Sequence, residues 1–315
     1  MWSYLVTRVL AALVTAFLAS LAVFLIIHAV PGDIVAQMLG QSGAGGTVSE
    51  QALREFFGLD RPLHVQFLKW LGSALQGDFG RSWTQGRLVT GIVYDAFLVT
   101  LEIGLLTLVI ATLIGVPLGL IAGIYEGSWI DNLIQGFNII GLSAPVFWIG
   151  LMLLIGASAY FYWSPPIVYM PPEVSLNENL AILALPVASL SLLQAAAYSQ
   201  FVRQSVVSTA HQDFVRTAIA KGLPLRRVYF KHILRNILIP LVTFMGLILI
   251  QILGGVVVTE SLFALPGIGR LLITAIQARD YPVVQGALFL IVIVALLINL
   301  IIDLLYHVID PRLRK

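Results

Sequence analysis

Long runs of apolar residues dominate the chain, and six of them are long enough to cross a membrane as helices. A bilayer core about 30 Å thick requires about 20 consecutive apolar residues, because no water is available there to satisfy the backbone. The six runs cover residues 6–30, 97–125, 133–163, 180–201, 237–259 and 283–306. We therefore predict an all-α polytopic membrane protein with six transmembrane helices.

The composition agrees with this pattern and excludes several classes of protein. Hydrophobic residues make up 59% of the 315 residues and charged residues 11%, against about 25% charged in soluble domains. A net charge of +2 is too small for a nucleic-acid partner. Without cysteine, and with scattered histidines that form no His-Glu-x-x-His pattern, the sequence predicts neither a metal site nor catalytic residues.

Basic residues indicate the orientation of the spans. The loop 202–236 holds one acidic residue, Asp213, and many basic ones, and the carboxyl-terminal tail is also basic. The basic residues of the loop and the tail are Arg203, Arg216, Lys221, Arg226, Arg227, Lys231, Arg235, Arg312, Arg314 and Lys315. Because short loops rich in Lys and Arg stay in the cytoplasm, we predict that this loop and, with six spans, both termini are cytoplasmic.

The spans divide the chain into four expected parts. These are an amino-terminal anchor helix at 1–30, an extracytoplasmic, periplasmic-side helical insert at 31–96, a five-helix core at 97–306 and a cytoplasmic basic tail at 307–315. Within the insert, residues 50–58 and 62–75 have the pattern of short amphipathic helices. Kinks or ordinary bundle packing are expected at the prolines inside or at the start of spans, Pro117, Pro145, Pro186 and Pro240.

The basic loop begins with the pattern of a short amphipathic helix. Asp213 is a residue type that caps helix starts. Val215, Ala218, Ile219 and Gly222 follow at i, i+3, i+4 and i+7, which predicts one apolar face. Gly222 also suits a left-handed helix end.

A second helix is predicted directly after this turn. Pro224 suits its first turn, and the same spacing recurs at Leu225, Val228, Tyr229 and His232. The result is a helix, a tight turn and another helix, apolar on one face and basic on the other. Such a segment either lies on anionic lipid or acts as a lever docked into a soluble partner.

The amino-acid sequence of this loop resembles the signature loop of permease subunits of bacterial ABC importers, in the dipeptide, oligopeptide and nickel family. It reads Arg216-Thr-Ala218 before Ala-Lys-Gly222 and then His-x-x-Arg-Asn-x-x-x-Pro240; Arg216-Thr-Ala218 stands where the general signature often has Glu-Ala-Ala. Other segments resemble the same family in order along nearly the whole chain: residues 28–33, 57–62, 76–80, 143–148, 259–270, 279–286 and 303–312.

The resemblance implies a type I-like permease that forms half of a pathway for di- or oligopeptides in the bacterial cytoplasmic (inner) membrane. It implies a second, homologous permease subunit, two cytoplasmic ABC ATPase subunits and an extracytoplasmic solute-binding protein. The loop 202–236, called the coupling segment below, would contact an ATPase. The resemblance assigns to that interface Asp213, Arg216, Thr217, Ala218, Lys221, Gly222 and His232.

The chain carries no phosphate-binding Gly-x4-Gly-Lys-Ser/Thr motif. ATP and magnesium are therefore expected in the partner subunits, with no cofactor bound by this chain. Four polar residues are candidates for the translocation pathway: Ser143, Gln194, Gln251 and Glu260. Gln194 and Gln251 either line a polar route or bond between helices. Glu260 and Arg270 either meet the delivered solute or its binding protein, or pair with each other.

Three alternatives remain open from the residues. Nickel or metallophore import is the nearest other cargo within the family. A self-sufficient secondary carrier or channel would need no ATPase, although the span centres lack the carboxylates usual in proton-driven carriers. An intramembrane enzyme would need an inward-facing nucleophile or metal pair, and the sequence has no Gly-x-Ser-x-Gly elbow.

Overall fold

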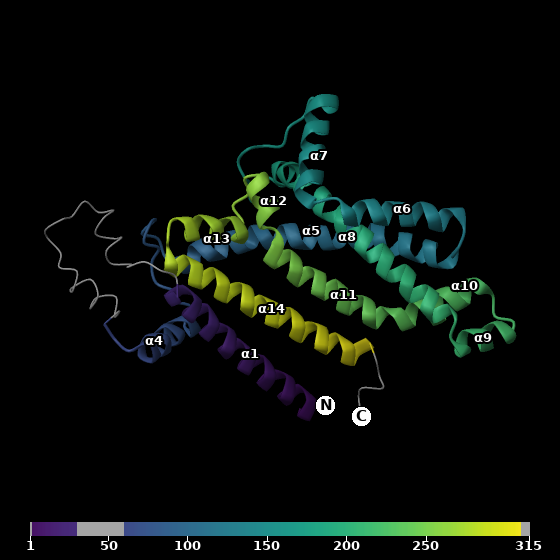
Figure 1. The fold of residues 1–315 in the computed structure, drawn as a ribbon, viewed down its shortest axis with the longest axis horizontal. Coiled ribbons are helices and arrows are strands. Elements are labelled where there is room, and N and C mark those ends of the chain that lie inside the picture. Colours follow the sequence, from purple (N-terminus) through teal and green to yellow (C-terminus); the bar gives the residue numbers. More distant parts are fainter. Residues whose placement is uncertain (1, 30–59, 310–315) are drawn as a thin grey trace. The chain divides into compact units, whose positions relative to one another are not determined.

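The computed structural model describes residues 2–29 and 60–309. Within these ranges the regular structure is helical, apart from an isolated antiparallel bridge between Arg81 and Leu88 (Figure 1). Five described helices are long and apolar enough to cross a membrane, or six if one sharply bent pair counts as a single span. This confirms the predicted all-α polytopic fold, while the helix expected at residues 50–58 lies outside the described residues.

The chain divides into two compact units. The larger unit comprises Ala96–Leu271 and Leu297–Lys315, and the smaller comprises Trp2–Asp95 and Leu272–Leu296. Helices that lie wholly or partly in the larger unit are α5 (Val89–Ile124), α6 (Trp129–Ser143), α7 (Val146–Phe161), α8 (Leu176–Ala210), α9 (Asp213–Ala220), α10 (Leu225–Arg227), the π-helix η1 (Val228–Ile233), α11 (Leu234–Gly255), α12 (Val257–Leu262), α13 (Ile268–Gln277) and α14 (Tyr281–Ile309).

Helices α5 and α8 of the larger unit pack with their backbones in close contact. Gly115, Gly119 and Gly123 form a stripe on α5 with four-residue spacing. A Cβ at Gly119 would lie 2.5 Å from the carbonyl oxygen of Ser199, and one at Gly123 would lie 2.7 Å from the Cβ of Val206. Small residues at this spacing allow membrane helices to approach closely, so α8 is held along several turns of α5.

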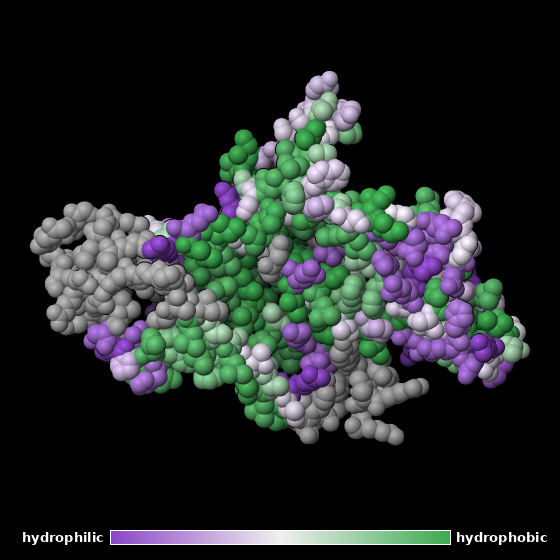
Figure 2. Space-filling model, in the orientation of Figure 1, coloured by the Kyte–Doolittle hydropathy of each residue, from purple (hydrophilic) through white to green (hydrophobic). Residues whose placement is uncertain are grey.

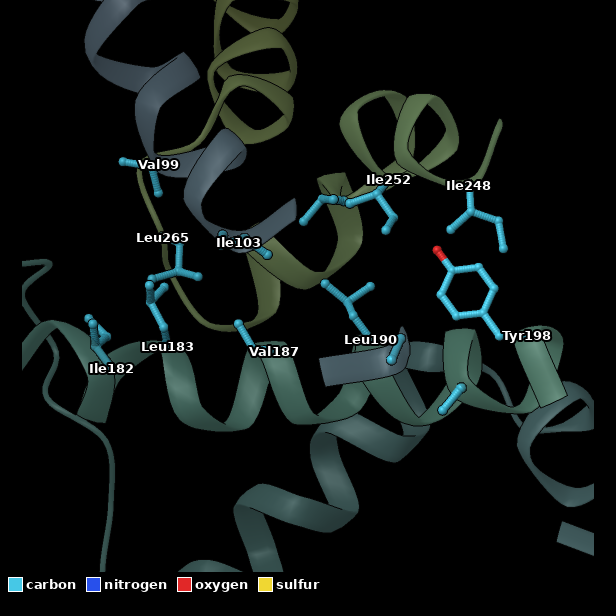
Figure 3. Close-up of a cluster of buried hydrophobic side chains, with 13 residues drawn as sticks. Val99, Ile103, Ile182, Leu183, Val187, Leu190, Tyr198, Ile248, Ile252 and Leu265 are labelled. Atoms are coloured by element: carbon cyan, nitrogen blue, oxygen red, sulfur yellow. The ribbon is translucent and has the colours of Figure 1, made fainter. Parts of the chain in front are cut away.

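The main apolar core of the larger unit lies on α8. Its side chains interlock with residues of α5 and α11, and the ring of Tyr198 stands between α8 and α11 (Figure 3). The aromatic rings of Tyr198 and Phe244 meet edge to face, with centroids 5.8 Å apart. The buried members are Val99, Ile103, Ala111, Ile182, Leu183, Val187, Leu190, Ala195, Tyr198, Ile248, Ile252, Val256 and Leu265.

The third predicted span is broken. Residues 133–163 do not form one helix, because α6 ends at Ser143, α7 begins at Val146, and the two axes meet at 102°. Ala144 is extended (φ −80°, ψ 129°) and Pro145 precedes the new helix, as expected where a proline ring disfavours helical geometry in the residue before it. At Pro117, Pro186 and Pro240 the helices α5, α8 and α11 continue through the proline.

The smaller unit is built around α1 (Trp2–Ala29) and α4 (Leu63–Leu75). The second amphipathic helix predicted in the insert is thus confirmed. Phe24 of α1 meets Phe67 of α4 with ring centroids 5.4 Å apart, and Trp70 of α4 meets Phe289 of α14 at 5.7 Å. Aromatic packing therefore ties α4 to two apolar helices.

Candidate functional site

Helix α9 of the coupling segment is anchored by its apolar face. Val215 and Ala218 are buried as predicted and pack with residues of α8, η1 and α11. Ile219, which the spacing places on the same face, is instead exposed. Asp213 lies in the first turn and Gln212 precedes the helix without a side-chain capping bond, so the predicted capping role of Asp213 is wrong. Its carboxylate still suits the positive end of the helix dipole.

The turn after α9 has the geometry predicted for Gly222. The amide of Gly222 donates to the carbonyl of Ile219 at 2.9 Å, and the amide of Leu223 donates to that of Ala218 at 3.3 Å. With Gly222 at φ +77°, these bonds complete a Schellman motif, which satisfies carbonyls that a helix end leaves free. A Cβ at Gly222 would meet no other atom within 4 Å. Glycine is therefore favoured there by the backbone conformation and not by lack of space.

The second predicted helix does not stop before the membrane. It begins at Leu225, passes through η1 and continues as α11, so that Leu225–Leu253 is one apolar helix. Val228 and Ile233 are buried, and His232 is half-buried. The second part of the coupling segment, from Leu225 onward, and the fifth span therefore form a single helix.

The outer surface of the coupling segment combines apolar side chains with positive charge. Phe214, Ile219, Leu225 and Phe230 are exposed. The basic side chains around them, also exposed, are Arg216, Lys221, Arg226, Arg227, Lys231 and Arg235. Figure 2 shows hydrophilic residues gathered over α9 and α10 with hydrophobic ones among them. A groove with apolar pockets and acidic rims would match this surface.

The polar residues assigned to the coupling interface lie along α9. Arg216 and Asp213 are mostly solvent-exposed, and their charged atoms approach within 3.7 Å. The hydroxyl of Thr217 donates to the carbonyl of Asp213 at 2.9 Å. Lys221 follows the last helical residue and is exposed. Exposed pairs of this kind contribute little to stability, which leaves their charges available to a partner.

The four candidate pathway residues occupy different environments. Ser143 is exposed at the break between α6 and α7, Gln194 is buried on α8, and Gln251 is exposed on α11. Glu260 is fully buried on α12. Among the described residues, no hydrogen bond joins any two of these four, and their assignment to a pathway stays a prediction.

Glu260 binds the start of α13. Its carboxylate accepts bonds from the Thr100 hydroxyl at 2.6 Å and from the amide of Arg270 at 2.9 Å, and a side chain at Gly267 would collide with it. Burial raises the pKa of the Glu260 carboxyl, and these hydrogen bonds act in the opposite direction. Arg270 thus contacts Glu260 through its backbone amide, which the sequence did not predict, and its positive charge also favours the ionised carboxylate.

A buried ion pair that the sequence did not predict joins α6 to α8. Arg203 donates from Nε to Asp131 Oδ1 at 2.5 Å and from Nη2 to Oδ2 at 2.7 Å. The side chains of Arg203 and Asp131 are only 19% and 2% exposed. Arg203 therefore does not belong to the exposed basic surface, and its isolation from the other loop cations in the sequence is the one signal of a separate role.

Asp280 is a second acidic residue with an unpredicted role, in the smaller unit. Its carboxylate accepts bonds from the hydroxyls of Ser82 (2.5 Å) and Thr84 (2.7 Å) and from the amides of Trp83 and Thr84 (both 3.2 Å). Asp280 is buried, so it holds the turn at residues 82–84 against the start of α14.

Replacing Asp280 by alanine should destabilise the protein by about 1–3 kcal/mol, because four donor groups would lose a buried acceptor. The thermal unfolding midpoint of the purified protein measures this loss. Asp78→Ala is the matched control, since its carboxylate is exposed and accepts a bond from the amide of Gly80. Equal midpoints for the two variants would contradict the anchoring role of Asp280.

Sequence comparisons match the whole chain to known transport proteins. The family model for the "binding-protein-dependent transport system inner membrane component" matches residues 115–315, and the model for the amino-terminal part of such components matches residues 1–104. The dipeptide transport system permease DppB of Escherichia coli K12 is 35% identical over 94% of both chains. The glutathione transport system permease GsiC of the same strain is 36% identical over 100% of this chain and 99% of its own.

The fold also resembles a solved structure. An inward-facing form of the methionine ABC transporter MetNI superposes with a TM-score of 0.55, covering 70% of this chain and 96% of that chain at 17% identity. At this identity the likeness concerns the fold alone.

Proposed function

Because the chain belongs to the family of binding-protein-dependent transport system inner membrane components, we propose that it is the permease of an ATP-driven importer of short peptides. The family that the motifs indicated is thereby confirmed. The chain is a multi-pass inner-membrane transport subunit that works in a complex with partner subunits. The names of two relatives, which refer to dipeptides and to glutathione, support short peptides as cargo over nickel or a metallophore.

The complex that we propose contains a second, homologous permease, two cytoplasmic ATPases and an external solute-binding protein. The observation that carries this proposal is the structure of the coupling segment. Helix α9 packs on α8, and the helix that begins at Leu225 continues into α11. An ATPase that grips the exposed side of α9 would move two spans at once. Loops rich in basic residues stay in the cytoplasm. The positive charge of the coupling segment therefore supports its location on the side of the membrane where the ATPases are.

The proposed cycle is alternating access. Closure of the ATPases around ATP and magnesium brings the coupling segments of the two permeases together and opens the pathway to the binding protein. Hydrolysis reverses the movement and opens the pathway to the cytoplasm. Selective binding within the membrane is not required, because the binding protein delivers the peptide. Ser143, Gln194 and Gln251 supply neutral polar groups for the route.

Ile219→Glu tests the docking surface. Ile219 is exposed and follows the buried positions Val215 and Ala218, near the end of α9. A carboxylate at Ile219 should therefore leave the fold intact. We expect the affinity for the ATPase subunits to fall by at least about tenfold, the effect of losing an apolar interface anchor. Pull-down of the ATPases from detergent-solubilised membranes measures it. Val174→Glu, at an exposed apolar position before α8, is the control, and equal recovery with both variants would refute the docking surface.

Substitutions of Gly222 test whether coupling depends on the backbone conformation of the turn after α9. Valine is strained at φ +77°, whereas asparagine tolerates this conformation. Peptide uptake should therefore fall in Gly222→Val and persist in Gly222→Asn, with both chains present in the complex. Normal uptake by Gly222→Val, or uptake by the chain alone in liposomes, would refute the lever and favour a self-sufficient carrier.

A further inference from the structure

Helix α4 has an apolar side that its packing does not use. Phe67 and Ala74 are buried against the rest of the smaller unit. Beside them on the helix surface, Leu68 and Leu75 are 62% and 75% exposed. At 100° per residue these two leucines lie within about 20° of each other, with Leu71 next to them. We call Leu68, Leu71 and Leu75 the leucine stripe.

Three of the four polar residues of α4 lie on the other side of the helix, whereas His64, exposed in the first turn, lies on the side of the leucine stripe. Gln66, Lys69 and Ser73 fall within an arc of about 60°, more than 90° from the leucine stripe. Lys69 is exposed. A helix with separate apolar and polar sides is typical of a segment that lies in a membrane interface.

The contacts of α4 with α1 determine how deep α4 lies relative to the membrane. Phe67 meets Phe17 of α1 at 5.7 Å and Phe24 at 5.4 Å between ring centroids. Both phenylalanines belong to the span Val6–Leu25. Phe17 lies eight residues from Leu25, which corresponds to about 12 Å along the helix. In a hydrocarbon core about 30 Å thick, Phe67 is therefore beside the apolar part of α1.

The surface of α1 next to this contact is itself a lipid surface. Phe17, Leu18 and Leu25 are exposed and belong to a span with little burial within the protein. The leucine stripe thus continues an apolar surface that already faces acyl chains. An aqueous location for α4 would instead expose this stripe to water next to a helix that is immersed in lipid.

From these contacts we infer that α4 is a membrane-embedded helix, with its leucine stripe covered by acyl chains of the leaflet that holds the Phe24 end of α1. The surface of α4 that carries Gln66, Lys69 and Ser73 faces the headgroups and water, where the Lys69 side chain can extend toward phosphate. This revises the expectation that the whole segment 31–96 lies outside the membrane. It depends only on the membrane location of the chain and not on its cargo.

The absence of native cysteine makes a direct test possible. Leu68→Cys and Leu75→Cys report on the leucine stripe, and Lys69→Cys and Ser73→Cys on the polar arc. Each full-length variant carries a nitroxide label, is reassembled with its partner subunits in lipid nanodiscs, and is compared for collision with oxygen, which enters lipid, and with a water-soluble nickel chelate. Leu13→Cys on α1 and Gln85→Cys in an exposed turn give the lipid and water references.

We expect labels at 68 and 75 to resemble the Leu13 reference and labels at 69 and 73 to resemble the Gln85 reference. Preferential collision of the stripe labels with the nickel chelate would overturn the inference. Protection of the stripe from both reagents only after the external binding protein is added would also overturn it, because the occupant would then be a protein. Failure of peptide uptake has no bearing on either outcome, so this test is separate from that of the transport function.

Discussion

Replacing Gly119 by leucine should abolish accumulation of the folded protein in the membrane. The position leaves no space for a side chain, because even a Cβ would approach the carbonyl oxygen of Ser199 to 2.5 Å. Backbone cannot rotate away as a side chain can, so α5 and α8 must separate. Overpacking alone costs about 1–3 kcal/mol, and separation of the two helices would add the loss of contacts on both sides. Against a total stability of about 5–15 kcal/mol, this loss is decisive.

The amount of monodisperse protein after detergent extraction measures this effect. Gly156→Leu on α7 is the matched control, because a Cβ at that position meets nothing within 4 Å. Gly119→Ala should give an intermediate yield. If Gly119→Leu accumulates to the level of Gly156→Leu, the close packing of α5 on α8 is wrong.

Replacing Asp131 by alanine should cost about 3–5 kcal/mol of unfolding free energy, because the Arg203 guanidinium would stay buried without its counter-ion. Asp131 also accepts a bond from the amide of Gly127 at 2.9 Å, and that donor would lose its acceptor as well. Denaturant-dependent unfolding in detergent micelles, followed by tryptophan fluorescence, measures the change.

Two further variants separate burial from charge pairing. Asp95→Ala removes one member of the exposed pair Arg87–Asp95, whose side chains are 63% and 66% exposed, and should cost less than about 1 kcal/mol. The double variant Asp131→Leu with Arg203→Met removes both buried charges and should recover much of the loss. A double variant as unstable as Asp131→Ala would show that the unpaired charge is not the cause.

The apolar runs predicted most of the helices, because a membrane span is fixed largely by its length and hydrophobicity. A kink at Pro145 was one of two expected outcomes, but the complete break at Ala144 was not predicted, since α6 and α7 are both apolar and their directions depend on packing. Ile219 shows a similar limit. Its spacing matches that of Val215 and Ala218. In this helix of eight residues, however, only Val215 and Ala218 are buried against neighbouring helices, so the buried face is narrower than the periodic pattern predicts.

The polar contacts were less accessible to prediction. Asp131 and Arg203 are 72 residues apart, and Asp280 lies 198 residues from Ser82. Local pattern carries no information on such pairs, which form when helices assemble. Gly222 is the opposite case, because its role depends on its own backbone conformation and on bonds to nearby residues.

The continuity of Leu225–Leu253 decides where mechanical compliance can reside. These 29 residues extend over about 43 Å at 1.5 Å per residue, and η1 keeps the axis hydrogen-bonded across the entry to the membrane. In the proposed cycle, a force applied at Leu225 would therefore reach the fifth span along a continuous helix. The short non-helical joints on either side of α9, at residues 211–212 and 221–224, are the places where α9 can turn relative to its flanking helices. In the proposed cycle, these joints would let α9 follow a docked ATPase while the spans keep their own orientation.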